Sequence, residues 1–388
     1  MIELQLDKIQ THYCEICQGW LEFCFDRYVR TFEGINIYLI NMPLLRCDSC
    51  GKYYFPEKTK KQILAVVESA KKQRKLEVKV SPRQDFKRRF NYGKIEFLYD
   101  HRDYENIPGL QRPWDDGCLT PVFFNIAVLN KYSQHPNYRL DLFSKTYGNI
   151  KKNDEFDIAF GINRNKRVIM WLGDIDKLPL NEQHYLRSEN VDSDHDLCSE
   201  FYESQIEVQF SNSSPENALF HVRSEVIEIC QIKRGGYLYK LEGEISKVIE
   251  NLDRPVFWQE KHISPVIEAL NRVMVESLNT QFIKNELKEV INENDIEKLR
   301  PLKLFERWLE KVIELSSFLD ISLPFFVLYD FRVLSSHLSS ESQKKKEIKS
   351  INQRLQLPVE NEKYELIYDT LINRLRESYE TILVQLDK

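Results

Sequence analysis

Two pairs of cysteines near the N-terminus constrain this 388-residue chain more than any other feature. Cys14 and Cys17 form one Cys-x-x-Cys pair, and Cys47 and Cys50 form the second. Such a turn presents two thiolates to one metal ion, and structural zinc takes four ligands in a tetrahedron. Gly51 suits a turn that requires a positive φ. Four protein thiolates leave no coordination position for water, so the pattern predicts one structural Zn²⁺.

The alternatives to zinc are a redox Cys-x-x-Cys pair or a chance spacing. In a reducing compartment, paired Cys-x-x-Cys motifs favour a metal over disulfides. The N-terminus lacks the apolar stretch of a signal peptide, and no apolar run is long enough to span a bilayer. We therefore expect a soluble, cytoplasmic protein without membrane contact. The other four cysteines are interpreted as small core residues: Cys24, Cys118, Cys198 and Cys230.

The first 57 residues resemble the YgiT/MqsA-type zinc finger of bacterial antitoxins and other small regulators. The matching residues are Cys14-Glu-Ile-Cys17, Met42-Pro43 and Cys47-Asp-Ser-Cys50-Gly51-Lys52-Tyr53-Tyr54. Gln18 stands where that family usually has glycine, which does not affect ligation. In antitoxins the finger pairs with a toxin, and a separate helix-turn-helix binds DNA. The sequence shows no helix-turn-helix, so the resemblance implies the finger and not the antitoxin function.

The length of the chain predicts two or three domains. A content of 42% hydrophobic and 30% charged residues is ordinary for a globular protein. The predicted segments are a zinc finger at 1–57, a basic helical connector at 58–94, a mixed α+β domain at 95–225 and a helical domain at 226–388. The predicted fold class is therefore multidomain α+β, ending in an all-α helical bundle.

The connector concentrates positive charge in a chain whose net charge is −5. Between Lys58 and Lys94 there are thirteen Lys or Arg residues and three acids, a local net charge of +10. Cations that neutralise phosphates bind nucleic acid without sequence preference, and Phe86, Phe90 and Tyr92 add aromatic rings that stack on bases. The alternative is a solvated linker, or a patch that meets acidic parts of the same protein. The predicted nucleic-acid-binding residues are Lys71, Lys72, Arg74, Lys75, Lys87, Arg88 and Arg89.

Apolar residues recur with a period near 3.6 in the C-terminal segment, which predicts a bundle of helices. Ser264-Pro265 and Ser322-Leu-Pro324 carry the serine cap and first-turn proline that begin a helix. We therefore expect one helix to begin at each of these two places.

The run Arg332-Val-Leu-Ser-Ser-His337 lies near the end of the second of these helices. It is similar to the Arg-x(4–6)-His signature of HEPN domains, helical bundles that often act as metal-independent ribonucleases. Histidine can move the proton of a ribose 2′-hydroxyl, and arginine can hold the phosphate. The resemblance implies a catalytic pair, Arg332 and His337, commonly shared across a homodimer.

The spacing of Arg332 and His337 limits where their side chains can meet. The two side chains lie about 140° apart on an ideal helix, so they converge only where the helix frays before His337. The alternative is a surface ion pair of Arg332 with Asp330 or Glu306, and a capping role for His337.

The middle segment carries no motif with recognisable chemistry. Strands at Asp157–Ile162 and Arg167–Leu172 flank a polar turn, which predicts a hairpin. The acidic loop at 192–196, with His184 nearby, is interpreted as solvated rather than metal-binding. By elimination, we expect this segment to sense a signal or to recognise a partner protein.

The leading hypothesis is a HEPN-type endoribonuclease with a structural zinc finger, of the kind used in toxin–antitoxin or phage-defence systems. It acts on RNA or another nucleic acid and forms a homodimer through the C-terminal helices. The runner-up is a non-enzymatic zinc-finger adaptor that binds nucleic acid or regulates a partner. A third hypothesis is a scaffold subunit whose helical bundle only dimerises.

Overall fold

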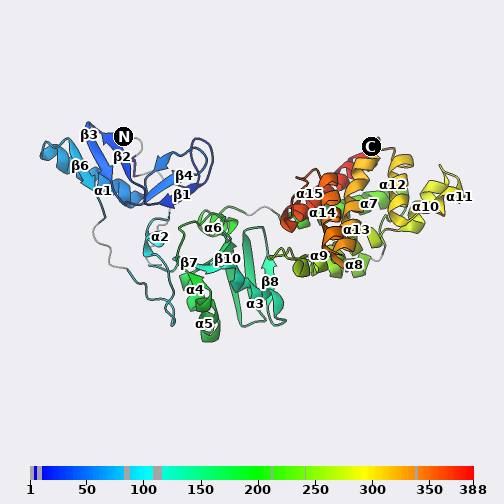
Figure 1. Cartoon of the computed structure of the whole chain (residues 1–388), viewed down its shortest axis with the longest axis horizontal. Helices are drawn as coiled ribbons and strands as arrows, with labels where there is room; N and C mark the ends of the chain where they lie inside the picture. Colours follow the sequence, from blue (N-terminus) through cyan, green and yellow to red (C-terminus); the bar gives the residue numbers. More distant parts are fainter. Residues whose placement is uncertain are drawn as a thin grey trace. The chain divides into compact units, whose positions relative to one another are not determined.

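The computed structural model describes residues 4–6, 11–82, 88–107, 116–210, 213–240, 242–336 and 340–388. The chain divides into two compact units, 1–212 and 213–388 (Figure 1). Within the described residues, the first unit contains three β-sheets and the second is helical, which confirms the predicted α+β class. None of the described helices has the length and apolar character needed to cross a membrane.

Two three-stranded sheets and one helix form the N-terminal part of the first unit. The first sheet contains, in spatial order, β1 (Leu21–Cys24), β4 (Leu44–Cys47) and β5 (Tyr53–Tyr54). The second contains β2 (Tyr28–Phe32), β3 (Ile35–Leu39) and β6 (Glu77–Val80), with β6 parallel to β3.

Helix α1 (Glu57–Lys72) packs against the second of these sheets. Its apolar stripe buries Ile63 and Val67 in one core with Ile37 and Val80 of the sheet. Residues 58–80, which the sequence places in the basic connector, therefore contribute a helix and a strand to the N-terminal core.

A six-stranded antiparallel sheet forms the rest of the first unit, with strand order β12-β7-β11-β10-β9-β8. The strands are β7 (Pro121–Asn125), β8 (Arg139–Leu142), β9 (Tyr147–Lys152), β10 (Phe156–Ile162), β11 (Arg167–Trp171) and β12 (Asn190–Val191). Pairing of β10 with β11 confirms the predicted hairpin. The helices beside this sheet are α2 (His101–Glu105), η2 (Ile126–Val128), α3 (Leu129–Gln134), α4 (Leu172–Asp176), α5 (Leu180–Ser188) and α6 (Glu200–Ile206).

The four-cysteine region and the six-stranded sheet share a hydrophobic core. Trp20, which precedes β1, is buried in one cluster with Trp171 of β11 and Phe201 of α6. Arg164, in the β10–β11 turn, forms ion pairs with Glu22, Asp48 and Asp196. These contacts join the two parts of the first unit through apolar packing and charge.

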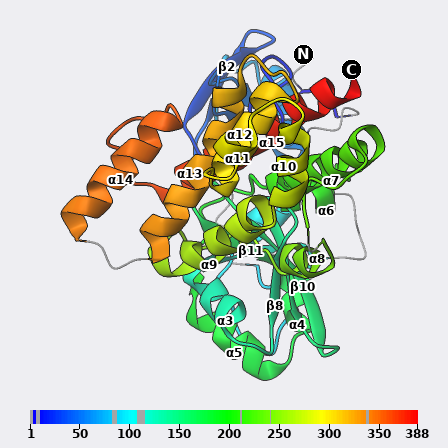
Figure 2. The ribbon, with the colours of Figure 1, turned by 90° about the vertical axis from the view of Figure 1, so that its right-hand side faces the viewer.

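The second unit is built from helices around one large core whose buried residues run from Leu219 to Leu386. Figure 2 shows α14 beside α13 at the edge of this unit. Helix α7 continues across positions 225 and 226, where the sequence places the start of the helical domain. The elements are α7 (Pro215–Arg234), α8 (Glu242–Glu250), α9 (Glu260–Asn271), η3 (Arg272–Glu276), α10 (Thr280–Lys288), α11 (Glu293–Ile296), α12 (Pro301–Lys311), α13 (Phe318–Ser336), α14 (Glu341–Arg354) and α15 (Tyr364–Asp387).

The two helix starts predicted at prolines are wrong. Pro265 lies inside α9 and Pro324 lies inside α13, each after more than one turn of helix. In both helices the turn before the proline carries a buried isoleucine, Ile263 or Ile321. Packing of these residues in the bundle core stabilises the additional turn and outweighs the signal of a proline at the first turn.

Candidate metal centre and cationic surface

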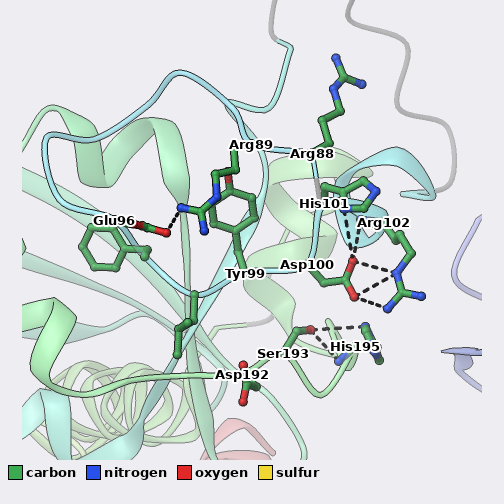
Figure 3. A pocket seen from close by; sticks show the side chains of 12 residues that line it. Arg88, Arg89, Glu96, Tyr99, Asp100, His101, Arg102, Asp192, Ser193 and His195 are labelled. Carbon is green, nitrogen blue, oxygen red and sulfur yellow. Dashed lines mark hydrogen bonds and ion pairs between the residues drawn. The ribbon is translucent and has the colours of Figure 1, made fainter. Parts of the chain in front are cut away.

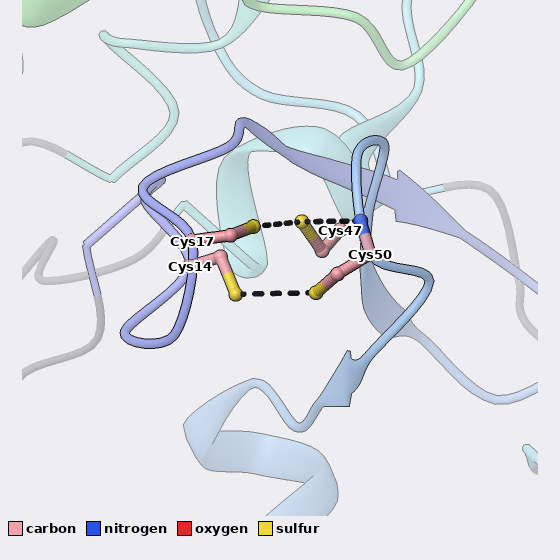
Figure 4. Close-up of side chains that lie close together, drawn as sticks. All are labelled: Cys14, Cys17, Cys47 and Cys50. Carbon is pink, nitrogen blue, oxygen red and sulfur yellow. Dashed lines mark hydrogen bonds between the residues drawn. The ribbon is translucent and has the colours of Figure 1, made fainter.

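The structure brings the four predicted metal ligands together (Figure 4). The sulfur atoms of Cys14 and Cys50 lie 3.6 Å apart, and those of Cys17 and Cys47 lie 3.4 Å apart. All four lie within 4.8 Å of one another. A tetrahedral Zn²⁺ with Zn–S bonds of about 2.3 Å requires sulfur–sulfur distances of about 3.8 Å. The cluster therefore has the size of a four-thiolate metal site.

Each Cys-x-x-Cys pair forms the same backbone turn. The carbonyl of Cys14 accepts a hydrogen bond from the N–H of Gln18, and the carbonyl of Cys47 accepts one from Gly51. Gln18 and Gly51 both have positive φ values, 59° and 70°. The left-handed conformation suits glycine and strains other residues. Gln18 therefore meets the same backbone requirement as Gly51 at a conformational cost.

The strand register places the two turns side by side. Leu21 of β1 pairs with Cys47 of β4, and the Asp48 N–H donates a hydrogen bond to the Trp20 carbonyl. A Cβ atom added at Gly19 would lie 2.5 Å from the Ser49 hydroxyl oxygen, so the close approach requires glycine. Antiparallel pairing of β1 with β4 thus brings the two Cys-x-x-Cys motifs, which lie far apart in the sequence, into one cluster.

Tyr54 of β5 supports the first cysteine of the cluster. Its hydroxyl lies 3.1 Å from the Cys14 sulfur and accepts a hydrogen bond from the Glu15 N–H. Burial raises the pKa of the Cys14 thiol, but Tyr54 and backbone N–H groups lower it to about 6. Burial and the Cys14 sulfur raise the pKa of Tyr54, so its hydroxyl remains a donor. Tyr54 therefore favours the thiolate form that binds metal.

The donor set fits a divalent cation. The Gly19 backbone lowers the pKa of Cys17, but the neighbouring sulfurs raise it to about 12, because thiolates this close repel one another. A cation removes that repulsion, and four thiolates select a soft or borderline ion such as zinc. Within the described residues, no other group of three or more His, Cys, Asp or Glu side chains is gathered in this way.

The predicted nucleic-acid-binding residues fall into two groups. Lys71, Lys72, Arg74 and Lys75 are exposed at the C-terminal end of α1 and in the turn that follows. Lys71 pairs with Glu33. In the described part of the chain no carboxylate pairs with the other three. Arg74 has a φ of 54°, and the Lys75 N–H donates to the Ala70 carbonyl, which ends the helix.

The second group is paired with acidic side chains. Arg88 forms ion pairs with Glu105 and Asp116, and Arg89 forms one with Glu96. Lys87 lies outside the described residues. Among the residues that the structure describes, Lys72, Arg74 and Lys75 therefore have no carboxylate partner, whereas Arg88 and Arg89 form ion pairs with neighbouring carboxylates.

Arg332 lies in the last turns of α13, and His337 lies outside the described residues. The Arg332 Nε donates to Glu268 of α9 at 2.8 Å. This carboxylate also pairs with Arg272. Both partners considered for Arg332 from the sequence are engaged elsewhere: Asp330 with Arg354, and Glu306 with Lys303.

The acidic loop at 192–196 is not the solvated segment that the sequence predicts. Asp194 accepts hydrogen bonds from Asn163, Asp196 pairs with Arg164, and His195 contacts the buried Asp103. The His195–Asp103 contact was not predictable from the sequence because the two residues are far apart in the chain. The one available signal was a histidine within a short acidic run.

The cysteine cluster agrees with a zinc finger, and the second unit is largely helical. These two observations do not identify a family, and no family model, curated protein or solved structure matches the chain.

Proposed function

We propose that this protein binds nucleic acid through the cationic turn at the C-terminal end of α1, formed by Lys72, Arg74 and Lys75. The observation that supports the proposal is that these three exposed side chains lack a carboxylate partner in the described part of the chain. Each cation that binds a phosphate releases counterions from the nucleic acid. A cation already paired with a carboxylate adds less binding free energy. Arg88 and Arg89 are therefore secondary candidates.

In this proposal the four cysteines hold one structural Zn²⁺. The ion fixes the β1–β4 pair, and Trp20 then packs against the six-stranded sheet. Lys72 is the last residue of α1, and Arg74 and Lys75 lie between α1 and β6. Both elements belong to the hydrophobic core beside the β1–β4 pair. The metal thus has no chemical role at the nucleic acid and stabilises the unit that carries the cations.

Fluorescence anisotropy with a labelled single-stranded RNA tests the proposal. The triple variant Lys72→Gln/Arg74→Gln/Lys75→Gln should bind at least tenfold more weakly than the parent at low salt, because about three phosphate contacts are lost. The matched control is Lys345→Gln/Lys346→Gln/Lys349→Gln on α14, which removes the same charge from the other unit. Equal losses of RNA affinity in both variants would show that binding depends on net charge alone and would refute the proposed surface.

Cations near a helix C-terminus also stabilise the helix dipole, usually by about 0.3–1 kcal/mol each. A purely structural role would therefore appear as a lower unfolding temperature with unchanged RNA affinity. Circular dichroism melting of the triple variant, measured beside its RNA binding, separates the two roles.

RNA cleavage by Arg332 and His337 is a second candidate, and one contact favours it. Glu268 holds the Arg332 side chain, which is 28% exposed, in a fixed position at the surface of the bundle. A fixed guanidinium loses less freedom when it binds a phosphate. In this proposal His337 is the acid–base group of a HEPN-type endoribonuclease, and the site is shared across a homodimer.

The cleavage proposal predicts RNA hydrolysis that persists in EDTA. His337→Ala and Arg332→Ala should each lower the rate about 10²–10⁴-fold. Arg272→Ala is the matched control, because Arg272 contacts the same carboxylate but is not part of the motif. Cleavage by the Arg332→Ala/His337→Ala variant at the parental rate would refute this site and leave the binding function intact.

A further inference from the structure

One face of the β2–β3–β6 sheet is accessible to a ligand. Helix α1 packs on the other face, in a core that buries Ile37 and Val80 of the sheet (Figure 1). Because successive side chains of a strand point to opposite faces of its sheet, the residues that alternate with the buried ones lie on the open face. None of these residues is buried: Val29 and Thr31 of β2, Asn36 and Tyr38 of β3, and Glu77 and Lys79 of β6.

Contacts between neighbouring strands agree with this arrangement. The Thr31 hydroxyl donates a hydrogen bond to the Asn36 side chain at 2.7 Å, and the Tyr38 hydroxyl lies 3.5 Å from a Glu77 carboxylate oxygen. Tyr38 does not contribute to the core beneath this sheet. The open face is therefore polar, with one aromatic ring on its central strand.

The strand register places Tyr38 between an apolar and a cationic side chain. Val29 of β2 is its partner on one side, and Lys79 of β6 is its partner on the other. Val29 is 47% exposed, and Lys79 is also exposed. Neighbouring strands lie about 4.8 Å apart, so the three side chains form one continuous row across the open face.

Lys79 continues the positive charge of the cationic turn. Among the described residues no carboxylate forms an ion pair with Lys79, as is also the case for the three cations of the turn. By contrast, Arg89, in a cavity beside α2, contacts the Glu96 carboxylate (Figure 3). Strand β6 begins shortly after the cationic turn and leads directly to Lys79. The turn and the open face are therefore one continuous surface.

Glu77 adds one carboxylate to the open face, beside Asn36 of the neighbouring strand. Its charge disfavours an acidic protein as the partner of this surface. Carboxylate and amide side chains can form hydrogen bonds with the edges of unpaired bases. One acid against the four cations of the turn and of Lys79 leaves the surface positive, which complements the phosphates of a nucleic acid.

We propose that a single strand of nucleic acid crosses the open face, with Tyr38 stacked on a base and Lys79 bound to a neighbouring phosphate. Every base has a face on which an aromatic ring can stack, but bases inside a duplex already stack on one another. The inference rests on the proposed nucleic-acid-binding function and assigns its substrate class, which is a single strand and not a duplex.

Fluorescence anisotropy with a labelled single-stranded RNA, and with the duplex of the same sequence, tests the proposal. Tyr38→Leu should weaken binding of the single strand about 5- to 100-fold, because base–aromatic stacking is lost. It should leave duplex binding unchanged. Tyr38→Phe keeps the ring and should bind as the parent does. Tyr237→Leu, at a tyrosine of the second unit that is 49% exposed, is the matched control.

Salt concentration separates the roles of Tyr38 and Lys79. Lys79→Gln should reduce the slope of log affinity against log salt concentration by about 0.7, because one phosphate contact is lost. Tyr38→Leu should weaken single-strand binding by the same factor at every salt concentration, because stacking releases no counterions. Lys79→Gln, on an exposed side chain, also keeps the proposal testable if Tyr38→Leu fails to fold.

Failure of this inference can be distinguished from failure of the proposed function. If the triple variant of the cationic turn loses affinity while folded Tyr38→Leu and Lys79→Gln bind the single strand as the parent does, the open face is not used and the turn still binds nucleic acid. If Tyr38→Leu and Lys79→Gln weaken binding while the triple variant does not, the open face binds the strand without the turn. Equal losses of single-strand and duplex affinity in Tyr38→Leu would overturn the stacking.

Discussion

Replacement of Cys47 by serine is expected to remove the metal and to destabilise the first unit selectively. Structural zinc contributes about 10–16 kcal/mol in four-ligand sites at neutral pH. In the described part of the chain, the apolar core around the cluster is small: Leu21, Leu45 and Tyr54 are buried beside the cysteines, and Phe23 packs against them. Burial of the two leucines contributes about 3–6 kcal/mol. The metal is expected to contribute more than these two leucines.

The effect should spread through the first unit but not to the second. Trp20 joins the β1–β4 pair to the core that contains Trp171, so unfolding of this pair exposes part of that core. The core of the second unit runs from Leu219 to Leu386 and contains no residue of the first. Differential scanning calorimetry should therefore show one transition shifted to lower temperature and one unchanged.

Elemental analysis supplies the matching readout. The parent should carry about one zinc per chain, and Cys47→Ser should carry less than a tenth of that amount. Cys24→Ser is the control, because Cys24 lies on β1 outside the cluster and should leave the zinc content unchanged. Full zinc content in Cys47→Ser, or an unaltered first transition, would contradict the four-thiolate site.

Further substitutions test the structure of the first unit. Gln18→Gly should raise its unfolding free energy by about 1 kcal/mol in urea titrations, because the strained φ of 59° is relieved. Gly51→Ala should lower it by a similar amount. Glu182→Ala should cost about 3–5 kcal/mol, because the buried Glu182 carboxylate binds Lys131 and two tyrosine hydroxyls. Burial raises the pKa of Glu182, but Lys131 and the tyrosines lower it overall. The stabilisation from Glu182 is therefore present above its unfolded pKa of about 4.5 and is lost as pH falls, so urea titrations of the parent and Glu182→Ala should converge in acid. The exposed Glu155→Ala should change little.

Local features were predictable from the sequence. The Cys-x-x-Cys spacing predicts the cluster because two thiolates in one turn depend on neighbouring residues only. The β10–β11 hairpin follows from two apolar runs around a polar turn. In both cases the decisive interactions lie within a few residues, where a sequence pattern is most informative.

Features that depend on distant contacts were not predictable. Pro265 and Pro324 resemble first-turn prolines, but burial of Ile263 and Ile321 against other helices extends each helix past that signal. A run of basic residues in the sequence also does not show which of them form ion pairs in the fold. Arg88 and Lys72 belong to the same basic segment, yet only the fold supplies Arg88 with Glu105 and Asp116.

The salt dependence of RNA binding tests the proposed function most directly. For single-stranded RNA, each phosphate contact adds about 0.7 to the slope of log affinity against log salt concentration. Loss of three contacts in Lys72→Gln/Arg74→Gln/Lys75→Gln should therefore reduce the magnitude of that slope by about two. The α14 control variant should keep the parental slope. A triple variant with the parental slope, or a parent whose RNA affinity does not change with salt, would contradict the assignment of this turn to nucleic-acid binding.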